Sequence, residues 1–250
     1  MCLIVVSIEL DQHLKKNFKI LANRDEYYER DSIPMHWWDF GGILAGRDVE
    51  GGGTWMGMNK SGRFAALTNV KETKLKEYKN SRGELVLDFL SSSLSIDDYF
   101  SIKKEKEFAG YNLLIGDKEE VAIFSNRSSG LSFLSAGVYG IGNLPYGTDS
   151  KKVDKVKKDF VSLLDEGVNK NSAVKLMQLE DGHLLEKTLA EMKPRDEEEI
   201  GYRFIKSGIY GTRCTTYIEI SSSGEVKVTE KNYNVNGEEG TELDFSFTSN

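Results

Sequence analysis

A cysteine lies directly behind the initiator methionine, and its position allows it to act as a nucleophile. The side chain of Cys2 is small, so a methionine aminopeptidase is expected to remove Met1. Cys2 would then carry a thiol, with a reference pKa of about 8.5, and a free α-amine, with a reference pKa of about 7.7–8.0. A nucleophile and its general base would share one residue, as in N-terminal covalent catalysis. The simpler interpretation is a small, buried side chain at a strand start.

The residues after Cys2 predict the elements that position it. The apolar, β-branched run to Leu10 predicts a buried strand over residues 2–10. A polar turn at 11–16 and a second apolar run at 18–23 predict a hairpin. The return strand should bring the Asn-Arg-Asp-Glu stretch at 23–26 within a side chain's reach of Cys2.

The rest of the chain predicts a meander of strands, then helices and a closing hairpin. The tail beyond residue 231, rich in Gly, Glu and Ser, is expected to be loosely ordered. No repeat or long linker divides the chain, so we expect a single domain over 1–250. Further strands are predicted at 43–46, 54–59, 64–69, 111–115, 121–124, 138–141, 212–220 and 225–231, and helices at 81–94, 96–107, 149–164, 171–180 and 183–192.

Composition and charge exclude several classes of protein. Of 250 residues, 39% are hydrophobic and 29% charged, as in ordinary soluble globular proteins. The net charge of −7, without a basic tract, argues against a general nucleic-acid or anionic-membrane binder. No apolar run approaches the roughly 20 residues of a membrane span, and no secretory signal pattern is present. These features predict a cytoplasmic protein.

The cysteines and histidines do not form a metal-binding pattern. Cys2 and Cys214 form no CxxC pair, and His13, His36 and His183 lie far apart. We therefore expect no metal and no cofactor. The scarcity of histidine also favours the α-amine as the base for Cys2.

Six short motifs follow one another in a diagnostic order. They are Cys2, the Asn-Arg-Asp-Glu stretch at 23–26, Gly-Gly-Thr-Trp-Met-Gly at 52–57, Leu-Thr-Asn at 67–69, Gly-Asn at 142–143 and Gly-Thr-Arg at 211–213. This set resembles the NRDE family, also called the transport and Golgi organisation type 2 family, over residues 2 to about 231. That family is similar to the cysteine N-terminal nucleophile hydrolases, such as penicillin V acylases and bile salt hydrolases. The resemblance implies an α+β fold, a four-layer αββα sandwich of two antiparallel sheets between helical layers.

The resemblance also implies a set of site residues. The related acylases use an N-terminal Cys, an Arg and an Asp after the first hairpin, two Asn and a late Arg. Because the spacing around residue 25 differs from that of the acylases, Asp25 and Glu26 both stay open as the acidic partner. The matching positions here are Cys2, Arg24, Asp25, Asn69, Asn143 and Arg213.

Each of these residues would have a defined part in amide hydrolysis. Asp25 would orient the ammonium of Cys2, and Asn69 or Asn143 would donate to the oxyanion. Arg24 and Arg213 would lower the thiol pKa. The simpler interpretations are structural ion pairs for the arginines and turn positions for the asparagines.

The implied function is that of an amidohydrolase or acyl-transfer enzyme acting on a small amide or acyl/thioester substrate. The family is also linked to haem trafficking and to lipid or acyl-CoA homeostasis. The alternative is therefore a non-catalytic carrier of haem or an acyl-lipid on the same fold. His36, beside Trp37 and Trp38, is the candidate axial ligand in that case. A small molecule is the expected partner in both, and the oligomeric state stays open.

Overall fold

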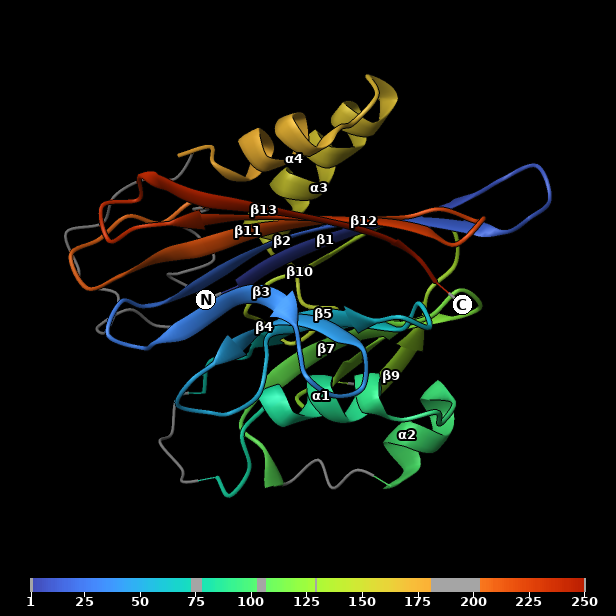
Figure 1. Ribbon diagram of the computed structural model, residues 1–250, viewed down its shortest axis with the longest axis horizontal. Coiled ribbons are helices and arrows are strands. Elements are labelled where there is room, and N and C mark those ends of the chain that lie inside the picture. The colour runs from blue at the N-terminus through green and yellow to red at the C-terminus, as the bar shows by residue number, and fades with distance from the viewer. Residues whose placement is uncertain (1, 73–77, 103–106, 129, 181–202, 250) are drawn as a thin grey trace.

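The computed structural model describes residues 2–72, 78–102, 107–128, 130–180 and 203–249. Two antiparallel sheets lie face to face with helices on their outer sides (Figure 1). One sheet has six strands in the order β10-β1-β2-β11-β12-β13, and the other has seven in the order β3-β4-β5-β6-β7-β8-β9. The strands are β1 (Cys2–Leu10), β2 (Lys16–Tyr27), β3 (Ser32–Trp37), β4 (Ile43–Asp48), β5 (Met56–Asn59), β6 (Phe64–Asn69), β7 (Tyr111–Gly116), β8 (Val121–Ser125), β9 (Gly130–Phe133), β10 (Gly137–Ile141), β11 (Tyr210–Ile220), β12 (Glu225–Tyr233) and β13 (Glu239–Thr248).

The helices complete the four layers. Helices α3 (Lys151–Asp165) and α4 (Lys170–Met177) cover the outer face of the six-stranded sheet, whereas α1 (Gly83–Ser91) and α2 (Ile96–Ile102) cover that of the seven-stranded sheet (Figure 1). The expected α+β fold, an αββα sandwich, is therefore confirmed. None of the described helices has the length and apolar character needed to cross a membrane.

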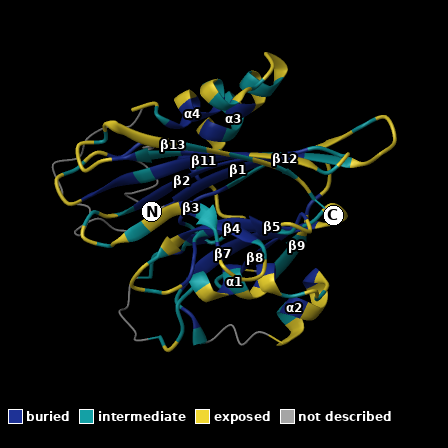
Figure 2. Cartoon of the chain, viewed as in Figure 1, coloured by how far each residue is buried: buried dark blue, intermediate teal, exposed yellow. Residues whose placement is uncertain are grey.

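The core consists of three apolar layers, and β1 contributes to two of them. Ile4, Val6 and Ile8 pack between the sheets, whereas Leu3 and Val5 face α3 and α4. A strand covered on both faces has no solvent side, which explains why β1 is apolar without a break from Cys2 to Val6. In Figure 2, β1 and the strands beside it are coloured mostly as buried. The site at the start of β1 is thus built on a rigid, two-sided core.

The predicted N-terminal hairpin is confirmed. Strands β1 and β2 pair so that Cys2 lies opposite Arg24, which in turn lies opposite Cys214 of β11. The register between β2 and β11 shifts between Thr212 and Cys214, so Arg213 is the extra residue of a bulge. Bulges re-aim side chains near sites, and this one separates the direction of Arg213 from that of Cys214.

The C-terminal tail is not loosely ordered as expected. Residues 239–248 form β13, which pairs along nearly the whole of β12. Phe245 and Phe247 alternate with polar residues and pack against the layer between the sheets, and Phe247 lies edge-on to Trp37 with ring centroids 5.1 Å apart. This alternation of period two is the strand signal that outweighs the Gly- and Glu-rich composition.

Several element boundaries also differ from the prediction. Strands β3 and β9 were not predicted, and α3 is capped by Ser150, whose hydroxyl accepts from the backbone N–H of Val153, rather than by Asp149. Ser81 and Glu84, at the start of α1, have the spacing of a capping box. Only half of it forms: the side chain of Glu84 accepts from the backbone N–H of Ser81, but no side chain caps the backbone N–H groups of the helix. The predicted helix at 183–192, His183 and residues 103–106 of the second predicted helix lie outside the described residues.

Candidate active site

Asn143 links the start of β1 to the opposite sheet. Because β10 pairs with β1, with Ile141 opposite Ile4, the loop after β10 passes beside Cys2. The backbone nitrogen of Cys2 donates to Oδ1 of Asn143 at 3.3 Å, and Nδ2 of Asn143 donates to the carbonyl of Asn69 at 2.8 Å. A carbonyl oxygen only accepts, so Nδ2 must face Asn69 and Oδ1 must face Cys2. Asn143 therefore orients the nitrogen of Cys2.

Two buried polar side chains that the sequence analysis did not single out fix the loop that carries Asn143. Thr68 donates to the carbonyl of Gly142 at 2.6 Å. Asn112 donates to the carbonyls of Gly142 and Leu144, at 3.2 and 2.9 Å. An asparagine inside the otherwise apolar stretch at 111–115 is the signal that would have pointed to Asn112, because buried polar groups need partners.

Asp25 is the acidic residue that lies beside Cys2. Its backbone N–H hydrogen-bonds the sulfur of Cys2, and its Oδ1 accepts from the hydroxyl of Thr212 at 2.7 Å. Burial raises the pKa of the Asp25 carboxyl, and the positive charge of Lys152 acts in the opposite direction. Glu26 instead takes part in an ion pair with Arg30 at 3.9 Å. The geometry thus separates the two candidates that the sequence left open.

Lys152 is a charged residue near the site that sequence reasoning missed. It lies in the first turn of α3 and is only 2% exposed. It is on the same face of α3 as Val156 and Phe160, four and eight residues later, which pack on the six-stranded sheet. A lysine in an apolar helix stripe was the available signal.

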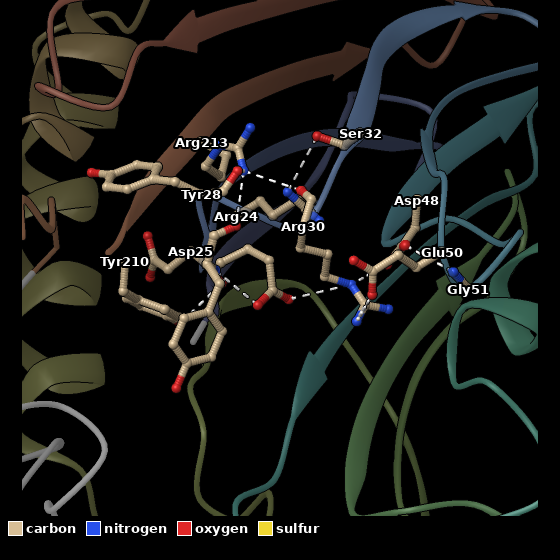
Figure 3. Close-up of polar contacts among 12 residues, drawn as sticks. Arg24, Asp25, Tyr28, Arg30, Ser32, Asp48, Glu50, Gly51, Tyr210 and Arg213 are labelled. Carbon is tan, nitrogen blue, oxygen red and sulfur yellow. Dashed lines mark hydrogen bonds and ion pairs between the residues drawn. The ribbon is translucent and has the colours of Figure 1, made fainter. Parts of the chain in front are cut away.

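Arg24 reaches from β2 into the space between the sheets. Its guanidinium lies 4.4 Å from the ring centroid of Trp55, and Nη1 donates to the hydroxyl of Ser32 at 3.5 Å (Figure 3). Trp55, expected to be a core residue, is thus also a wall of the site. No ion pair joins Arg24 to Asp25, because the two side chains leave β2 on opposite faces.

Arg213 lies at the rim of the site. Its Nη1 donates to the backbone carbonyls of Tyr27, Tyr28 and Arg30, at 2.9, 3.3 and 3.2 Å (Figure 3). It therefore fixes the chain that leaves β2. An ion pair of Arg213 with Glu219, six residues later in β11, would have been the structural alternative, but Glu219 accepts a hydrogen bond from the hydroxyl of Tyr217.

The thiol pKa differs from the expectation. Burial raises the pKa of Cys2, and the nearby carboxylate of Asp25 adds to this rise; the charge of Arg24 and the backbone N–H of Asp25 lower it by less. The charge of Arg24 acts in the expected direction, but desolvation outweighs it, so the thiol pKa is raised and not lowered. Arg213 is bound to backbone carbonyls at the rim and is not among the charges that act on the thiol.

The space beside Cys2 is small. It has a volume of about 10 Å³, room for about one water molecule. Cys2, Arg24 and Trp55 form its polar and aromatic walls, and the rest of the lining is mainly apolar: Ile4, Ala22, Met56, Ala66 and Leu67, with Asn23 and Thr216. Asn23 itself is bound to the carbonyls of Met177 and Arg203, so it anchors β2.

The haem candidate lies elsewhere. His36 is a half-buried residue of β3 whose Nδ1 lies 2.8 Å from the carbonyl of Pro34, and its ring stacks on that of Trp38 with ring centroids 6.1 Å apart. It does not line the space beside Cys2. Within the described ranges, no group of three or more His, Cys, Asp or Glu residues is arranged to hold a metal ion.

Cys214 occupies a different environment on the other side of Arg24. It is buried beside Glu230, whose Oε1 accepts from the backbone N–H of Met35 at 2.7 Å and from Asn232 at 3.3 Å. Burial raises the pKa of Glu230. Burial and the carboxylate of Glu230 together raise the pKa of Cys214 well above its usual range. The expectation of a small, unreactive neighbour fits this environment.

Comparison with known proteins extends the match over nearly the whole chain. The profile of the family described as "Transport and Golgi organisation 2" matches residues 1–235. The Transport and Golgi organization 2 homolog of Mus musculus is 28% identical over 257 residues, and the human homolog is 28% identical over 259 residues; each match covers 92% of this chain and 92% of the relative.

Two solved structures resemble the chain more distantly. A Caenorhabditis elegans N-acylethanolamine-hydrolyzing acid amidase ortholog aligns with 71% of this chain and 86% of its own, at 14% identity and a TM-score of 0.49. A variant of the conjugated bile acid hydrolase from Clostridium perfringens aligns with 98% of this chain and 97% of its own, at 8% identity and a TM-score of 0.45. The layer order described above rests on the strand pairing of this chain and not on these alignments.

Proposed function

The chain belongs to the Transport and Golgi organisation 2 family, and from that premise we propose that it is a cysteine N-terminal nucleophile amidohydrolase or acyl-transfer enzyme. Its substrate would be a small amide or an acyl thioester. The observation that carries this proposal is the hydrogen bond from the nitrogen of Cys2 to Oδ1 of Asn143. Once the preceding residue is removed, that nitrogen is an α-amine, and it already has an acceptor in place.

The proposed reaction uses the two functional groups of Cys2. Its α-amine takes the thiol proton, and the sulfur attacks the substrate carbonyl carbon. The amine then gives the proton to the leaving nitrogen or sulfur as the old bond breaks, which leaves a thioester on Cys2. Water attacks this thioester with the amine again as base, which releases the acid and restores the thiol.

Neighbouring residues divide the remaining tasks. Asn143 and Asp25 orient the ammonium, the first through Oδ1 and the second through its nearby carboxylate. Because Asn143 uses its Nδ2 on Asn69, the side chain of Asn69 is the better candidate for the oxyanion donor. Arg24 places a positive charge beside the sulfur, and Arg213 holds the rim. The side-chain roles of Cys2, Arg24, Asp25, Asn69, Asn143 and Arg213 all belong to this proposal.

The experiment is to trap the thioester. Protein whose N-terminal residue is Cys2, as verified by intact mass, is mixed with short-chain acyl thioesters and amides and quenched in acid. We expect an acyl adduct on the N-terminal peptide of wild type and of Cys214→Ala, but not of Cys2→Ala. Equal acylation of Cys2 and Cys214, or of protein that retains Met1, would remove the amine from the mechanism.

If no adduct forms, the alternative is that the protein is a non-catalytic carrier of haem or an acyl-lipid. The described residues offer it little support, because His36 on β3 does not line the space beside Cys2, and that space holds about one water. Tight binding of haem or an acyl-lipid by Cys2→Ala, without turnover by wild type, would favour the carrier.

A further inference from the structure

Three arginines approach the Cys2 site without a carboxylate partner. We name Arg24, Arg82 and Arg213 the arginine cluster. Arg82 is half-buried at the start of α1, and its Nη1 donates to the carbonyl of Gly110 at 3.0 Å. Across the described part of the chain, none of the three guanidinium groups lies within 4.0 Å of a carboxylate oxygen. Their hydrogen bonds go to hydroxyl and carbonyl oxygens, which carry no full charge.

The acidic residues near the rim of the cluster are already paired with other arginines, whereas burial raises the pKa of the two deeper carboxyl groups beside Arg24, those of Asp25 and Glu230. Arg30 binds Asp48 at 2.9 Å and Glu50 at 3.1 Å, and it also approaches Glu26 (Figure 3). Glu72, on the other flank, pairs with Arg127 at 2.6 Å. The arginine cluster is therefore an excess of positive charge at one place in a chain whose net charge is −7.

Two members of the cluster approach the thiol, and the third approaches Arg24. Arg24 of β2 lies directly opposite Cys2 in the sheet. Arg82 is close enough for a Cys2 thiolate to raise the pKa of its guanidinium, against the larger lowering by burial. Arg213 of β11 is close enough to Arg24 for their charges to repel, although burial is the main reason that the pKa of Arg213 is lowered. Holding like charges together costs free energy that a bound anion would recover.

We propose that the arginine cluster is the subsite for an anionic head group of the substrate, a carboxylate or a phosphate, beside the carbonyl that Cys2 attacks. This inference rests on the proposed function and adds the substrate class. A guanidinium group matches both kinds of oxyanion with two parallel hydrogen bonds. Since the space at Cys2 holds about one water, the head group lies at the rim, where Arg82 and Arg213 are less buried.

The test compares two alkylating agents of similar shape and different charge. Iodoacetate is an anion and iodoacetamide is neutral; with both, the sulfur of Cys2 forms a bond to the CH2 carbon as the carbon–iodine bond breaks and iodide leaves. The labelling rates of Cys2 with the two agents are measured by peptide mass. The ratio of the iodoacetate rate to the iodoacetamide rate is then divided by the same ratio for free glutathione, and this normalised ratio measures the preference of the site for an anion. We expect a normalised ratio of about ten or more, the contribution of one charge-assisted hydrogen bond. A ratio near one would overturn the proposal.

Variants assign the effect to the cluster. Arg82→Gln should lower the normalised ratio about tenfold, and Arg82→Lys should retain part of it because the charge remains. Arg47→Gln makes the same change in net charge at an exposed position of β4 and should leave the ratio unchanged. An equal fall in Arg47→Gln would mean that only the overall charge matters, which contradicts a subsite. Circular dichroism and the labelling rate with iodoacetamide identify any variant that is misfolded.

Competition identifies the head group. At matched ionic strength, propionate or inorganic phosphate is added during labelling, with chloride as reference. Slower labelling of Cys2 with propionate assigns a carboxylate, and slower labelling with phosphate assigns a phosphate; if neither differs from chloride, the subsite does not exist. The iodoacetate ratio needs no turnover, so it can succeed where thioester trapping fails. Hydrolysis of neutral amides that is unaffected by Arg82→Gln, with a ratio near one, would leave the proposed function intact and remove the subsite alone.

Discussion

Cys2 and Cys214 lie on either side of the same residue, Arg24, and yet their surroundings differ. The two cysteines are two strand spacings apart, roughly 9.5 Å between Cα atoms, which is beyond the reach of a disulfide. Cys2 lies beside the backbone N–H of Asp25, from β2, and the amide of Asn143, from the loop after β10; Cys214 lies beside the buried carboxyl group of Glu230. Arg24 is common to both cysteines, so the difference between the two thiols comes from their other neighbours.

The largest expected effect comes from removing one thiol at a time. Cys2→Ala should lower turnover of an acyl substrate by at least about 10³-fold, because the nucleophile is lost. Cys214→Ala should leave turnover within about twofold. Steady-state rates with the substrate found by thioester trapping provide the measurement. Comparable losses in both variants would show that the two sites are not distinct in the way described.

Asn143→Ala tests the neighbour that only Cys2 has. It removes the acceptor for the nitrogen of Cys2 and the donor to Asn69, so we expect turnover to fall by about 10²-fold, as for other groups that position reacting atoms. Unfolding in urea should show a loss of about 1–3 kcal/mol, since buried partners are left unsatisfied. Asn112→Ala is the matched control for the loop itself. Full turnover in Asn143→Ala would show that the hydrogen bond has no part in the reaction.

The pH dependence of alkylation sharpens the comparison. While Met1 remains, burial raises the pKa of Cys2, so labelling by iodoacetamide should rise mainly in the alkaline range. Removal of Met1 places an ammonium on Cys2 itself, which favours the thiolate and should move the rise to lower pH, with labelling about tenfold faster near pH 7. Cys214 should react more slowly than Cys2 in both forms, because its pKa is raised further. Peptide mass across pH 5–9 distinguishes the two sites, and identical profiles with and without Met1 would contradict this account.

Glu230→Gln tests the neighbour that only Cys214 has. The folded-state pKa of Glu230 is raised by burial, so the folded protein binds this proton more tightly than the unfolded chain. Stability from this group is therefore fully present below the unfolded pKa, about 4.3, and is lost as the pH rises through the folded value. Gln keeps an oxygen for the N–H of Met35 but cannot ionise.

Between pH 5 and 8, the free energy of unfolding should therefore fall less in Glu230→Gln than in wild type, by on the order of 1 kcal/mol. Asp25, whose pKa is also raised by burial, remains in the variant and leaves a slope of the same sign. Urea unfolding at several pH values measures the difference, and parallel curves for the two proteins would show that Glu230 does not titrate differently on folding.

The hairpin could be predicted from the sequence because its signals are local, whereas the layers of the sandwich were implied by the family resemblance. The apolar run of β1, the polar turn and the return strand fix the pairing of Cys2 with Arg24 without knowledge of the rest of the fold. The family resemblance then supplied Asn69 and Asn143 as positions near the thiol. It did not supply the direction of the hydrogen bonds, since the orientation of an amide depends on what lies on both sides of it.

The charged residues around the site other than Arg24, Asp25 and Arg213 could not be predicted in this way. Arg82, Lys152 and Glu230 reach the site or its neighbour from the start of α1, from α3 and from β12, and each stands in a stretch that resembles an ordinary amphipathic element. Their importance appears only when the layers are stacked. The same is true of the thiol pKa, because desolvation depends on the whole fold and not on the arginines adjacent in sequence.

The depth at which the nitrogen of Cys2 lies fixes the order of events in biosynthesis. This nitrogen is buried, at the first residue of a strand that is paired on both sides, and its acceptor, Asn143, lies 141 residues further along the chain. An aminopeptidase cannot reach a bond at that position once β1 is enclosed. In the proposed mechanism, whatever precedes Cys2 would therefore have to be cleaved while the nascent chain is still emerging from the ribosome, before β10 exists to cover it. Chains that miss this interval would fold with a blocked amine, so the fraction of competent molecules would be set during translation and not by any later signal.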